Sequence, residues 1–266
     1  MKLEFLTAIS FILLTAGVNV TAQTDKPDLW NGKQCAVVLT YDDATNFHLD
    51  NVIPALDSLE LRATFYVPGA SASLYKRMDE WREAARKGHE LGNHTIFHPC
   101  HGKSKNRKWV NPDYDMDNYT ISKFIDEIKV NNTLLKAIDG KTVRTFAYTC
   151  GDTSIGDSSF VDLLKNYFIA ARGVNPGVNY INSTNLFNIK TFGVKNKTAE
   201  ELINLIEKEK SKNAMITLLF HGVGGGKPFS MTTEEHSKFI HYLKQNEDNI
   251  MIVPMVEAVK SWNRMK

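Results

Sequence analysis

Short apolar runs alternate with longer segments of helical spacing through most of this chain. Seven short runs are predicted strands: 36–40, 63–67, 90–93, 143–148, 167–171, 215–220 and 250–253. The segments after them, with apolar residues three and four apart, are predicted helices: 52–59, 75–86, 121–138, 158–166, 199–212, 233–245 and 255–262. Strands that alternate with helices in this way form a parallel sheet with right-handed crossovers. The pattern predicts one barrel-like α/β domain.

The first 22 residues have the pattern of a secretory signal peptide: one Lys, an apolar run from Phe5 to Val18, and small residues before Gln23. The apolar run is shorter than the roughly 20 residues that span a bilayer, so cleavage after Ala22 is favoured over a retained membrane anchor. We expect an exported protein, periplasmic or secreted, with no membrane insertion after cleavage. Residues 23–33 would form an N-terminal lead-in, and residues 34–266 the folded domain.

Composition narrows the class of protein further. Hydrophobic residues make up 42% of the 266 residues, enough for a core that needs neither disulfide nor metal to hold it. A net charge of +2 offers no basic surface for a polyanion, so nucleic-acid binding is not expected. The odd number of cysteines, Cys35, Cys100 and Cys150, leaves at least one thiol outside any internal pair. One disulfide can form, and the sequence assigns neither its pairing nor an oligomeric state.

The polar segment 99–118 is long for a connection between a strand and a helix. Loops of this length in compact domains are commonly functional or mobile. Its four basic residues fit a solvated surface. Trp109 and Tyr114 can either stack on a sugar ring or pack the loop against the domain.

Three groups of polar residues follow predicted strands, where the active sites of parallel α/β folds gather. Asp42 and Asp43 end the first strand, and adjacent side chains there point in different directions. His94 and His98 follow the third strand, with a spacing that would put both imidazoles on one side of a helical turn. Two imidazoles and a carboxylate form a frequent catalytic zinc set. His221 ends the run 215–220 and can act as a general acid. Each group alone also fits an ordinary loop, and their coincidence favours chemistry.

The chain resembles the polysaccharide deacetylases of the NodB homology type, carbohydrate esterase family 4, over roughly residues 34 to 262. Three motifs carry the resemblance: Thr40-Tyr41-Asp42-Asp43, Asn93-His94-Thr95-x-x-His98 and Leu219-Phe220-His221. The resemblance implies a distorted (β/α) barrel of about seven parallel strands. It also implies one divalent metal ion, usually Zn²⁺ with Co²⁺ as an alternative, held by Asp43, His94 and His98.

The resemblance further implies that Asp42 is the general base and His221 the general acid. The chemistry leads to the same roles, since a metal ion polarises the acetyl carbonyl and lowers the pKa of water. Asp42 then takes a proton from the attacking water, and His221 protonates the departing sugar nitrogen or oxygen. The implied substrate is an acetylated carbohydrate polymer or oligomer.

One motif departs from the family. The family's Arg-Pro-Pro-Tyr-Gly aligns with residues 147–151, so Ala147 stands in place of the arginine that usually orients the base. The backbone N–H of Cys150 can still be an oxyanion donor, because the side chain does not matter for that role. Arg172, at the end of the fifth predicted strand, either supplies the missing guanidinium or is structural. The acidic residue that normally partners the acid histidine has no clear counterpart around 170–174.

Two alternatives stay open. An O-acetyl esterase such as an acetylxylan esterase would use the same metal, base and acid, so the sequence does not separate amide from ester substrates. A non-catalytic carbohydrate-binding relative would be expected to lack a metal ligand or the acid. None is missing here: the chain has Asp42, Asp43, His94, His98 and His221.

Overall fold

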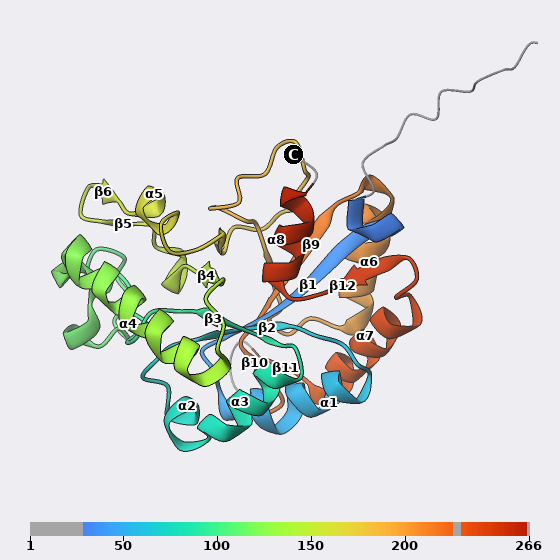
Figure 1. Ribbon diagram of the computed structural model, residues 1–266, viewed down its shortest axis with the longest axis horizontal. Helices are drawn as coiled ribbons and strands as arrows, with labels where there is room; N and C mark the ends of the chain where they lie inside the picture. The colour runs from blue at the N-terminus through green and yellow to red at the C-terminus, as the bar shows by residue number, and fades with distance from the viewer. Residues whose placement is uncertain (1–28, 226–229, 265–266) are drawn as a thin grey trace, which may run out of the picture.

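The computed structural model describes residues 29–225 and 230–264 of the chain. Its main sheet is parallel, with the strand order β7-β4-β3-β2-β1-β9-β8 and with β12 beside β1 (Figure 1). The strands of this sheet are β1 Cys35–Asp42, β2 Thr64–Val67, β3 Glu90–Asn93, β4 Thr145–Ala147, β7 Ala170–Arg172, β8 Phe192–Gly193, β9 Met215–Phe220 and β12 Ile250–Ile252. All seven predicted strands therefore occur, and the prediction of a single α/β domain with about seven parallel strands is confirmed.

Helices connect most of these strands. They are α1 Ile53–Ser58, α2 Ala72–Lys76, α3 Met78–Arg86, α4 Ile121–Asp139, α5 Val161–Leu164, α6 Ala199–Glu209, α7 Thr233–Gln245 and α8 Met255–Asn263. Two short two-stranded sheets accompany them: β5 Ser154–Ile155 with β6 Ser158–Ser159, and β10 Gly222–Val223 with β11 Ser230–Met231. Threonine side chains accept backbone N–H groups at the starts of α4, α6 and α7, which satisfies donors that the first helical turn leaves open.

The structure differs from the predicted elements in three places. The predicted helix 75–86 divides into α2 and α3 because Arg77 leaves the helical conformation, with φ −134° and ψ 36°. The predicted helix 158–166 is reduced to the single turn α5. The sequence does not predict β8, since two residues are too few for an alternating pattern and only pairing with β9 makes them a strand.

The two sides of β1 face different layers. Cys35, Val37, Leu39 and Tyr41 belong to a core shared with α1, α3, α6 and α7. Ala36 and Val38, one residue out of step, pack with α8 on the opposite side of the sheet. In Figure 1 α8 lies on one side of β1, and α1 and α3 lie on the other. By the same alternation Asp42, the last residue of β1, belongs to the α8 side.

The sheet curls because β1 has two different neighbours along one edge. Residues 35–37 pair with β12, whereas residues 40–42 pair with β2. On the other edge β9 pairs with most of the strand. Separation of β12 from β2 opens the concave side into a half-barrel, which α8 fills at the N-terminal end of β1 with Met255, Val259 and Trp262. The opposite end, where the parallel strands finish, stays open.

A buried carboxylate fastens α8 to the closed end. Glu90, the first residue of β3, accepts the backbone N–H of Val256 at 2.9 Å, that of Thr145 at 3.0 Å and the hydroxyl of Thr64 at 2.8 Å. A carboxylate at a helix N-terminus is favourable because the first N–H groups there lack partners within the helix. The closed end of the half-barrel is thus a structural region.

Two histidines, His89 and His236, are buried in the interior. Burial lowers the pKa of His89 to about 4, and the Asp57 carboxylate opposes that shift only partly. Burial also lowers the pKa of His236 to about 4. His236 Nε2 lies 2.8 Å from the hydroxyl of Tyr41. Both imidazoles are therefore neutral in the folded protein at neutral pH.

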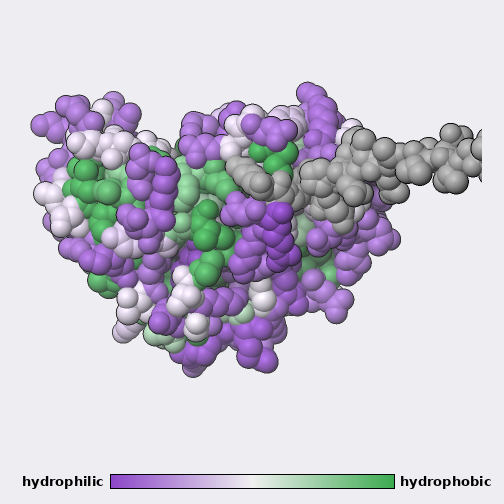
Figure 2. All heavy atoms as spheres, turned by 45° about the horizontal axis from the view of Figure 1, so that its top comes forward, coloured by the Kyte–Doolittle hydropathy of each residue, from purple (hydrophilic) through white to green (hydrophobic). Residues whose placement is uncertain are grey.

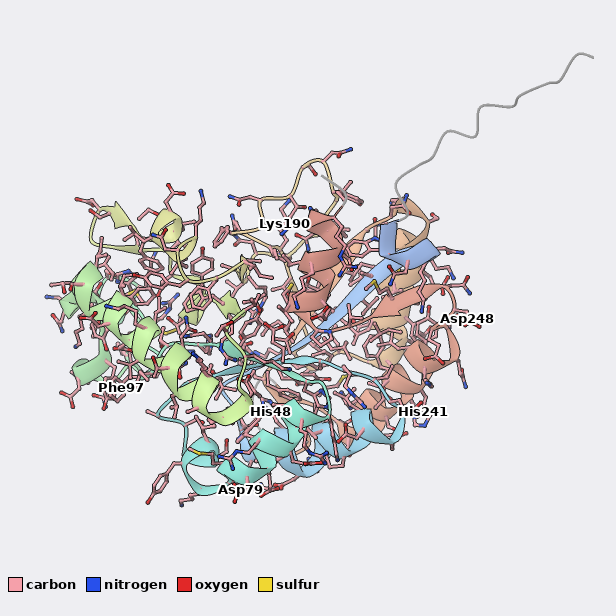
Figure 3. The ribbon with its side chains drawn as sticks, in the orientation of Figure 1. His48, Asp79, Phe97, Lys190, His241 and Asp248 are labelled. Carbon is pink, nitrogen blue, oxygen red and sulfur yellow. A yellow bond between two sulfur atoms is a disulfide. The ribbon has the colours of Figure 1, made fainter. Side chains whose placement is uncertain are left out.

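We expect the free energy of unfolding to fall as the pH drops from about 6.5 to about 4. In that window the unfolded chain binds protons on these histidines and the folded protein does not, so each contributes a slope of about 1.4 kcal/mol per pH unit. Urea unfolding of His236→Gln should show a shallower slope than the parent. His241→Gln is the control, because His241 is exposed on the outer side of α7 (Figure 3). Equal slopes in all three proteins would contradict the assignment.

Polar side chains cover most of the face shown in Figure 2, with smaller hydrophobic areas between them. Among the described residues, no helix is both long and apolar enough to cross a membrane. The predicted signal peptide, residues 1–22, and most of the predicted lead-in lie outside the described residues.

Candidate active site

β1 delivers its two carboxylates to the open end in different ways. Asp42 is the last residue of the strand, and it is only 3% exposed. Asp43 and Ala44 then have φ values of 76° and 46°, so the chain leaves the strand through a left-handed turn that non-glycine residues rarely adopt. This turn leaves the Asp43 side chain partly exposed and close to two histidines. Backbone strain of this kind is commonly kept at functional sites.

Asp43, His94 and His98 form a group that can hold a metal ion. Asp43 Oδ1 lies 3.7 Å from His94 Nε2 and 3.4 Å from His98 Nε2. One ligand atom from each residue lies within 4.8 Å of the others. The donor set of one carboxylate and two imidazoles suits zinc and similar divalent ions and leaves coordination positions for water and substrate.

A hydrogen bond from the second ring nitrogen of His94 favours its role as a metal ligand. His94 Nδ1 donates to the carbonyl of Ala147 at 2.9 Å, which leaves the lone pair of Nε2 facing the cluster. Burial, and secondly the neighbouring His98, hold the pKa of His94 well below its usual range. The imidazole is neutral, as a metal ligand must be.

The turn that carries both histidines is irregular, so the expectation of a helical turn is wrong. Thr95 and His98 have φ values of 62° and 54°. Two external groups hold the turn in this form. Asn93 Oδ1 accepts the Thr95 N–H at 2.8 Å, and Glu127 of α4 accepts the N–H groups of Ile96 and Phe97 at 3.2 and 3.1 Å. A carboxylate from a distant helix replaces the hydrogen bonds that a helical turn would make for itself.

Arg172 reaches Asp42 across the interior of the half-barrel. Its guanidinium Nη2 forms an ion pair with Asp42 Oδ1. Arg172 ends β7, four strands away from β1 in the sheet order, and is 0% exposed. Its guanidinium also lies 4.9 Å from the centre of the Tyr66 ring and donates to the carbonyl of Gly173 at 3.1 Å. Ala147 has no guanidinium that could pair with Asp42. In the structure, Arg172 forms this pair instead.

His221 directly follows β9 and lies at the same open end. The element before α1 is a π-helix, His48–Val52, which holds the backbone of the His221 loop. His48 Nε2 lies 2.6 Å from the His221 carbonyl, and Asn51 Nδ2 donates to the Val223 carbonyl at 2.7 Å. Burial lowers the pKa of His48 to about 4, so the neutral ring donates its Nε2 proton. π-helical turns are frequent at functional sites.

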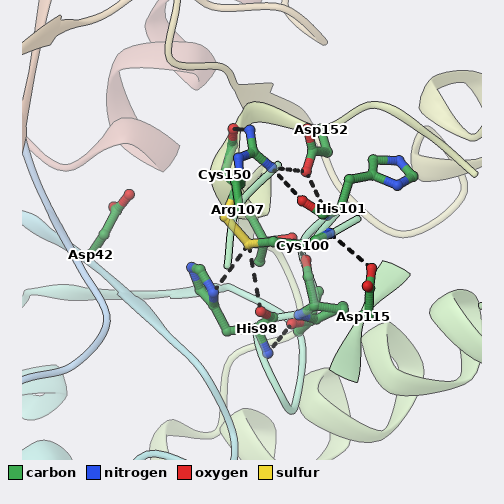
Figure 4. Close-up of a disulfide and its surroundings, with 12 residues drawn as sticks. Asp42, His98, Cys100, His101, Arg107, Asp115, Cys150 and Asp152 are labelled. Carbon is green, nitrogen blue, oxygen red and sulfur yellow. Dashed lines mark hydrogen bonds and ion pairs between the residues drawn. A yellow bond between two sulfur atoms is a disulfide. The ribbon is translucent and has the colours of Figure 1, made fainter. Parts of the chain in front are cut away.

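Cys150 lies in the turn Thr149–Gly151 and forms a disulfide with Cys100. Figure 4 shows this disulfide next to His98, whose Nδ1 lies 3.6 Å from Cys100 Sγ. The bond joins the segment after the second histidine to the turn whose backbone N–H is the predicted oxyanion donor. A second set of candidate metal donors, His98 with the two sulfurs, is excluded because both sulfurs are bonded to each other. Cys35 is a buried free thiol.

A cavity of about 890 Å³ brings these groups together. Six of the seven predicted site residues line it: Asp42, Asp43, His94, His98, Cys150 and His221. Arg172 lies behind Asp42 and contacts that carboxylate from the interior. The rest of the wall includes aromatic side chains of residues 97–114, among them Phe97, Trp109 and Tyr114.

The sequence does not indicate two supporting residues, Glu127 and His48. Glu127 is a polar position in a helix, and nothing in its spacing marks it as the acceptor for the 94–98 turn. His48 lies among loop residues after the Asp pair. Glu127 binds backbone N–H groups 30 and 31 positions before it, and His48 binds a carbonyl 173 positions after it, so no local motif indicates either contact.

A family model described as "Polysaccharide deacetylase" matches residues 31–167, about half of the chain. The chain belongs to the polysaccharide deacetylase family. The match contains β1 through β4 and therefore Asp42, Asp43, His94, His98 and Cys150. His221 and Arg172 lie beyond it.

Solved structures of this family share the fold. A peptidoglycan N-acetylglucosamine deacetylase is 16% identical, with a TM-score of 0.53 over 87% of this chain and 95% of the other. A family 4 acetyl xylan esterase from Clostridium thermocellum, in complex with a cobalt ion, is 22% identical, with a TM-score of 0.51 over 85% and 90%. A family 4 pseudoenzyme from Bacillus anthracis is 18% identical, with a TM-score of 0.52 over 84% and 65%. At these identities the likeness concerns the fold alone.

Among curated proteins, a gellan lyase of Bacillus sp. is 29% identical to this chain over 192 residues. The matched region covers 72% of this chain and 7% of the gellan lyase. The chain thus spans a small fraction of the length of that relative.

Proposed function

We propose that this protein is a metal-dependent hydrolase that removes acetyl groups from a carbohydrate with N-acetyl sugars. One observation carries the proposal: the Asp43, His94 and His98 group, the Asp42 carboxylate and His221 line one cavity, and Arg172 pairs with Asp42 from behind. These residues come from the ends of four strands, β1, β3, β7 and β9. A carboxylate held by a buried guanidinium next to a metal-binding group is suited to proton transfer from water.

Each residue has one role in this proposal. Asp42 accepts a proton as the oxygen of water bonds to the acetyl carbon, and Arg172 keeps the carboxylate ionised and aimed. His221 donates a proton to the sugar nitrogen as the bond between carbon and nitrogen breaks. The Cys150 N–H donates to the oxygen that gains charge. A divalent ion held by Asp43, His94 and His98 would supply Lewis acidity for the carbonyl and lower the pKa of water.

An O-acetyl ester is the second candidate substrate. The same proton transfers would cleave the bond between the acetyl carbon and the ester oxygen. One structural neighbour is an acetyl xylan esterase. A non-catalytic role is less well supported, even though another neighbour is a pseudoenzyme, because this chain keeps the metal-binding group, the base and the acid together.

Release of acetate from defined substrates tests the proposal. The panel consists of N-acetylglucosamine oligomers, peptidoglycan and acetylxylan, each with the zinc-loaded, cobalt-loaded and chelator-treated protein. We expect acetate from at least one N-acetylated substrate, and its loss after chelation. Acetate from acetylxylan alone would favour the esterase, and no acetate from any substrate with either metal would reject both candidates.

Metal analysis makes a separate prediction. The purified protein, reconstituted with zinc or cobalt and freed of excess ion, should hold one equivalent per chain. His94→Ala should weaken metal binding strongly, because it removes the imidazole that the Ala147 carbonyl orients. Less than half an equivalent in the parent, or unchanged affinity in His94→Ala, would contradict the proposed ligand group.

Export is a further part of the proposal. The predicted signal peptide is one argument, and the Cys100–Cys150 disulfide is a second, since disulfides persist mainly in oxidising compartments. Mass spectrometry of the protein from a culture of its expressing cells would show a mature chain that begins at Gln23 if cleavage follows Ala22.

A further inference from the structure

His98 lies between two groups of possible metal ligands. Its Nε2 atom lies 3.4 Å from Asp43 Oδ1, in the ligand group of the active site. Its Nδ1 atom, on the other side of the ring, lies 3.6 Å from Cys100 Sγ (Figure 4). His98 and the sulfurs of Cys100 and Cys150 form a second group, whose ligand atoms all lie within 4.8 Å of one another. The same imidazole therefore belongs to both groups.

The Nδ1 atoms of the two site histidines have different partners. His94 Nδ1 donates to the carbonyl of Ala147 at 2.9 Å, which keeps its Nε2 atom directed at the active-site group. His98 Nδ1 faces a sulfur of the disulfide instead, and sulfur is a weak hydrogen-bond acceptor. A metal ion that binds Nδ1 of His98 would therefore replace only a weak contact.

The two sulfurs can be ligands only after the disulfide is reduced. A dithiol, or two thiols, reduces the bond: two electrons pass to the cysteine sulfurs, each of which takes up a proton, and the reductant becomes a disulfide. A zinc ion that binds the reduced pair displaces both protons, because the thiolate is the form that binds metal. Two thiolates and one imidazole are a donor set common in zinc sites, and water can take the fourth position because His98 is partly exposed.

The two cysteines would stay close together after reduction, because other contacts join their segments. Thr149 Oγ1 donates to the Pro99 carbonyl at 2.5 Å, and Asp152 accepts the backbone N–H of His101 at 3.0 Å. Arg107 adds an ion pair with Asp152 at 2.5 Å (Figure 4). Zn–S bonds of about 2.3 Å in tetrahedral geometry put two sulfurs about 3.8 Å apart. The cysteine Cα atoms are 5.8 Å apart, so rotation about the Cα–Cβ bonds can separate the sulfurs this far.

We propose that reduction of the Cys100–Cys150 disulfide creates a second metal site, in which both cysteines and His98 Nδ1 bind a zinc ion. A neutral imidazole offers one lone pair, so His98 cannot also serve the active-site group through Nε2. An ion at the sulfur site would leave that group with Asp43 and His94 alone. By this consequence, which rests on the proposed function, a thiol reductant stops acetate release even when zinc is plentiful.

Cobalt absorption tests the proposal directly, since thiolate-bound Co²⁺ has a sulfur-to-metal charge-transfer band in the near ultraviolet. The purified protein is reduced with a water-soluble phosphine, which becomes the phosphine oxide, and is freed of it under argon before Co²⁺ is added. We expect the band in the reduced protein and none in the oxidised protein, with one equivalent of cobalt bound in each. Zinc added afterwards should displace the cobalt and abolish the band.

Three variants identify the ligands. Cys100→Ser combined with Cys150→Ser should show no band with or without reductant. Cys35→Ala is the matched control, because Cys35 is the third thiol and is buried outside both ligand groups. Its reduced form should keep the band. His98→Ala should raise the Kd of the reduced site for cobalt about tenfold or more, since even the loss of a group behind a ligand weakens metal binding roughly 10–100-fold.

His94→Ala separates the two sites, because His94 belongs to the active-site group alone. The oxidised variant should bind cobalt weakly, whereas the reduced variant should hold one equivalent and show the band. With zinc present, reduction should stop acetate release by the parent protein. The double serine variant should release acetate equally well with and without reductant, because it has no disulfide to reduce.

Several results would overturn the inference. One is the absence of the band in the reduced parent protein. Another is a band that survives in the double serine variant or disappears in Cys35→Ala. Two cobalt equivalents in the reduced parent protein would show that His98 is not taken from the active-site group. Failure of the proposed function gives a different result: the band appears on reduction, but the oxidised protein releases no acetate from any substrate with zinc or cobalt.

Discussion

Asp43→Asn is expected to lose both the bound metal ion and the acetate-releasing activity, whereas Asp42→Asn is expected to lose activity alone. Asp43 is the only carboxylate of the candidate ligand group, and a neutral amide oxygen is a much weaker ligand for zinc. Asp42 instead pairs with Arg172. Removal of a general base typically lowers turnover by a factor of roughly 100 to 10,000. Metal content by atomic emission and kcat with the preferred substrate measure the two effects.

Asp79→Asn is the control for this pair, because Asp79 is an exposed carboxylate at the start of α3 (Figure 3). It should keep one metal equivalent and the parent kcat. If Asp42→Asn and Asp43→Asn both bound metal normally and stayed active, neither carboxylate would have its assigned role. If Asp42→Asn lost the metal as well, Asp42 would be a ligand in place of a base.

Arg172→Met is expected to lower both turnover and stability while the metal ion stays bound. The substitution leaves the Asp42 carboxylate buried without its guanidinium, and loss of one partner from a buried ion pair costs roughly 3–5 kcal/mol. The same carboxylate is no longer aimed at water, so kcat should fall. Urea unfolding, metal content and kcat below the melting temperature measure the three quantities.

Two further variants separate positioning from general stability. Arg144→Met breaks an ion pair with Asp139 that is just as buried, but Arg144 precedes β4 at the opposite end of the strand from the cavity. It should destabilise the protein and leave kcat of the folded protein unchanged. The double variant Asp42→Asn with Arg172→Met removes both charges, so no buried charge remains unpaired. Its loss of stability should therefore be smaller than the sum of the losses in the two single variants. If Arg172→Met kept the kcat of the parent protein, Asp42 would be oriented by other groups.

Local patterns predicted the main strands correctly, and they predicted which polar residues lie together at one cavity. The runs that become β3 and β9 have the predicted boundaries, and α7 matches residue for residue. The meeting of Asp42, Asp43, His94, His98 and His221 was predictable because each lies at the end of a parallel strand or in the segment after it, and parallel strands end at the same edge of a sheet. The elements that failed are short or depend on a partner, such as β8 and the turn of α5.

The supporting contacts were not predictable in the same way. The Arg172–Asp42 pair joins residues 130 positions apart, and the sequence left Arg172 as either functional or structural. The Cys100–Cys150 pairing was one of several choices, and it depends on how the 99–118 segment crosses the 149–152 turn. The 94–98 turn takes its form from Glu127 of α4, so the histidine spacing alone suggested a helical turn that is not there.

The sequence by itself determined the order of strands and helices, the chemistry available at the strand ends, and the family to which the chain belongs. These follow from periodicity and from short motifs, which are properties of neighbouring residues. The tertiary structure decided which of those groups meet. β1 pairs with β12 along its first half and with β2 along its second half, so the sheet curls and brings the end of β7 to the end of β1. That curl results from contacts among residues far apart in the chain, and it places the Arg172 guanidinium on Asp42.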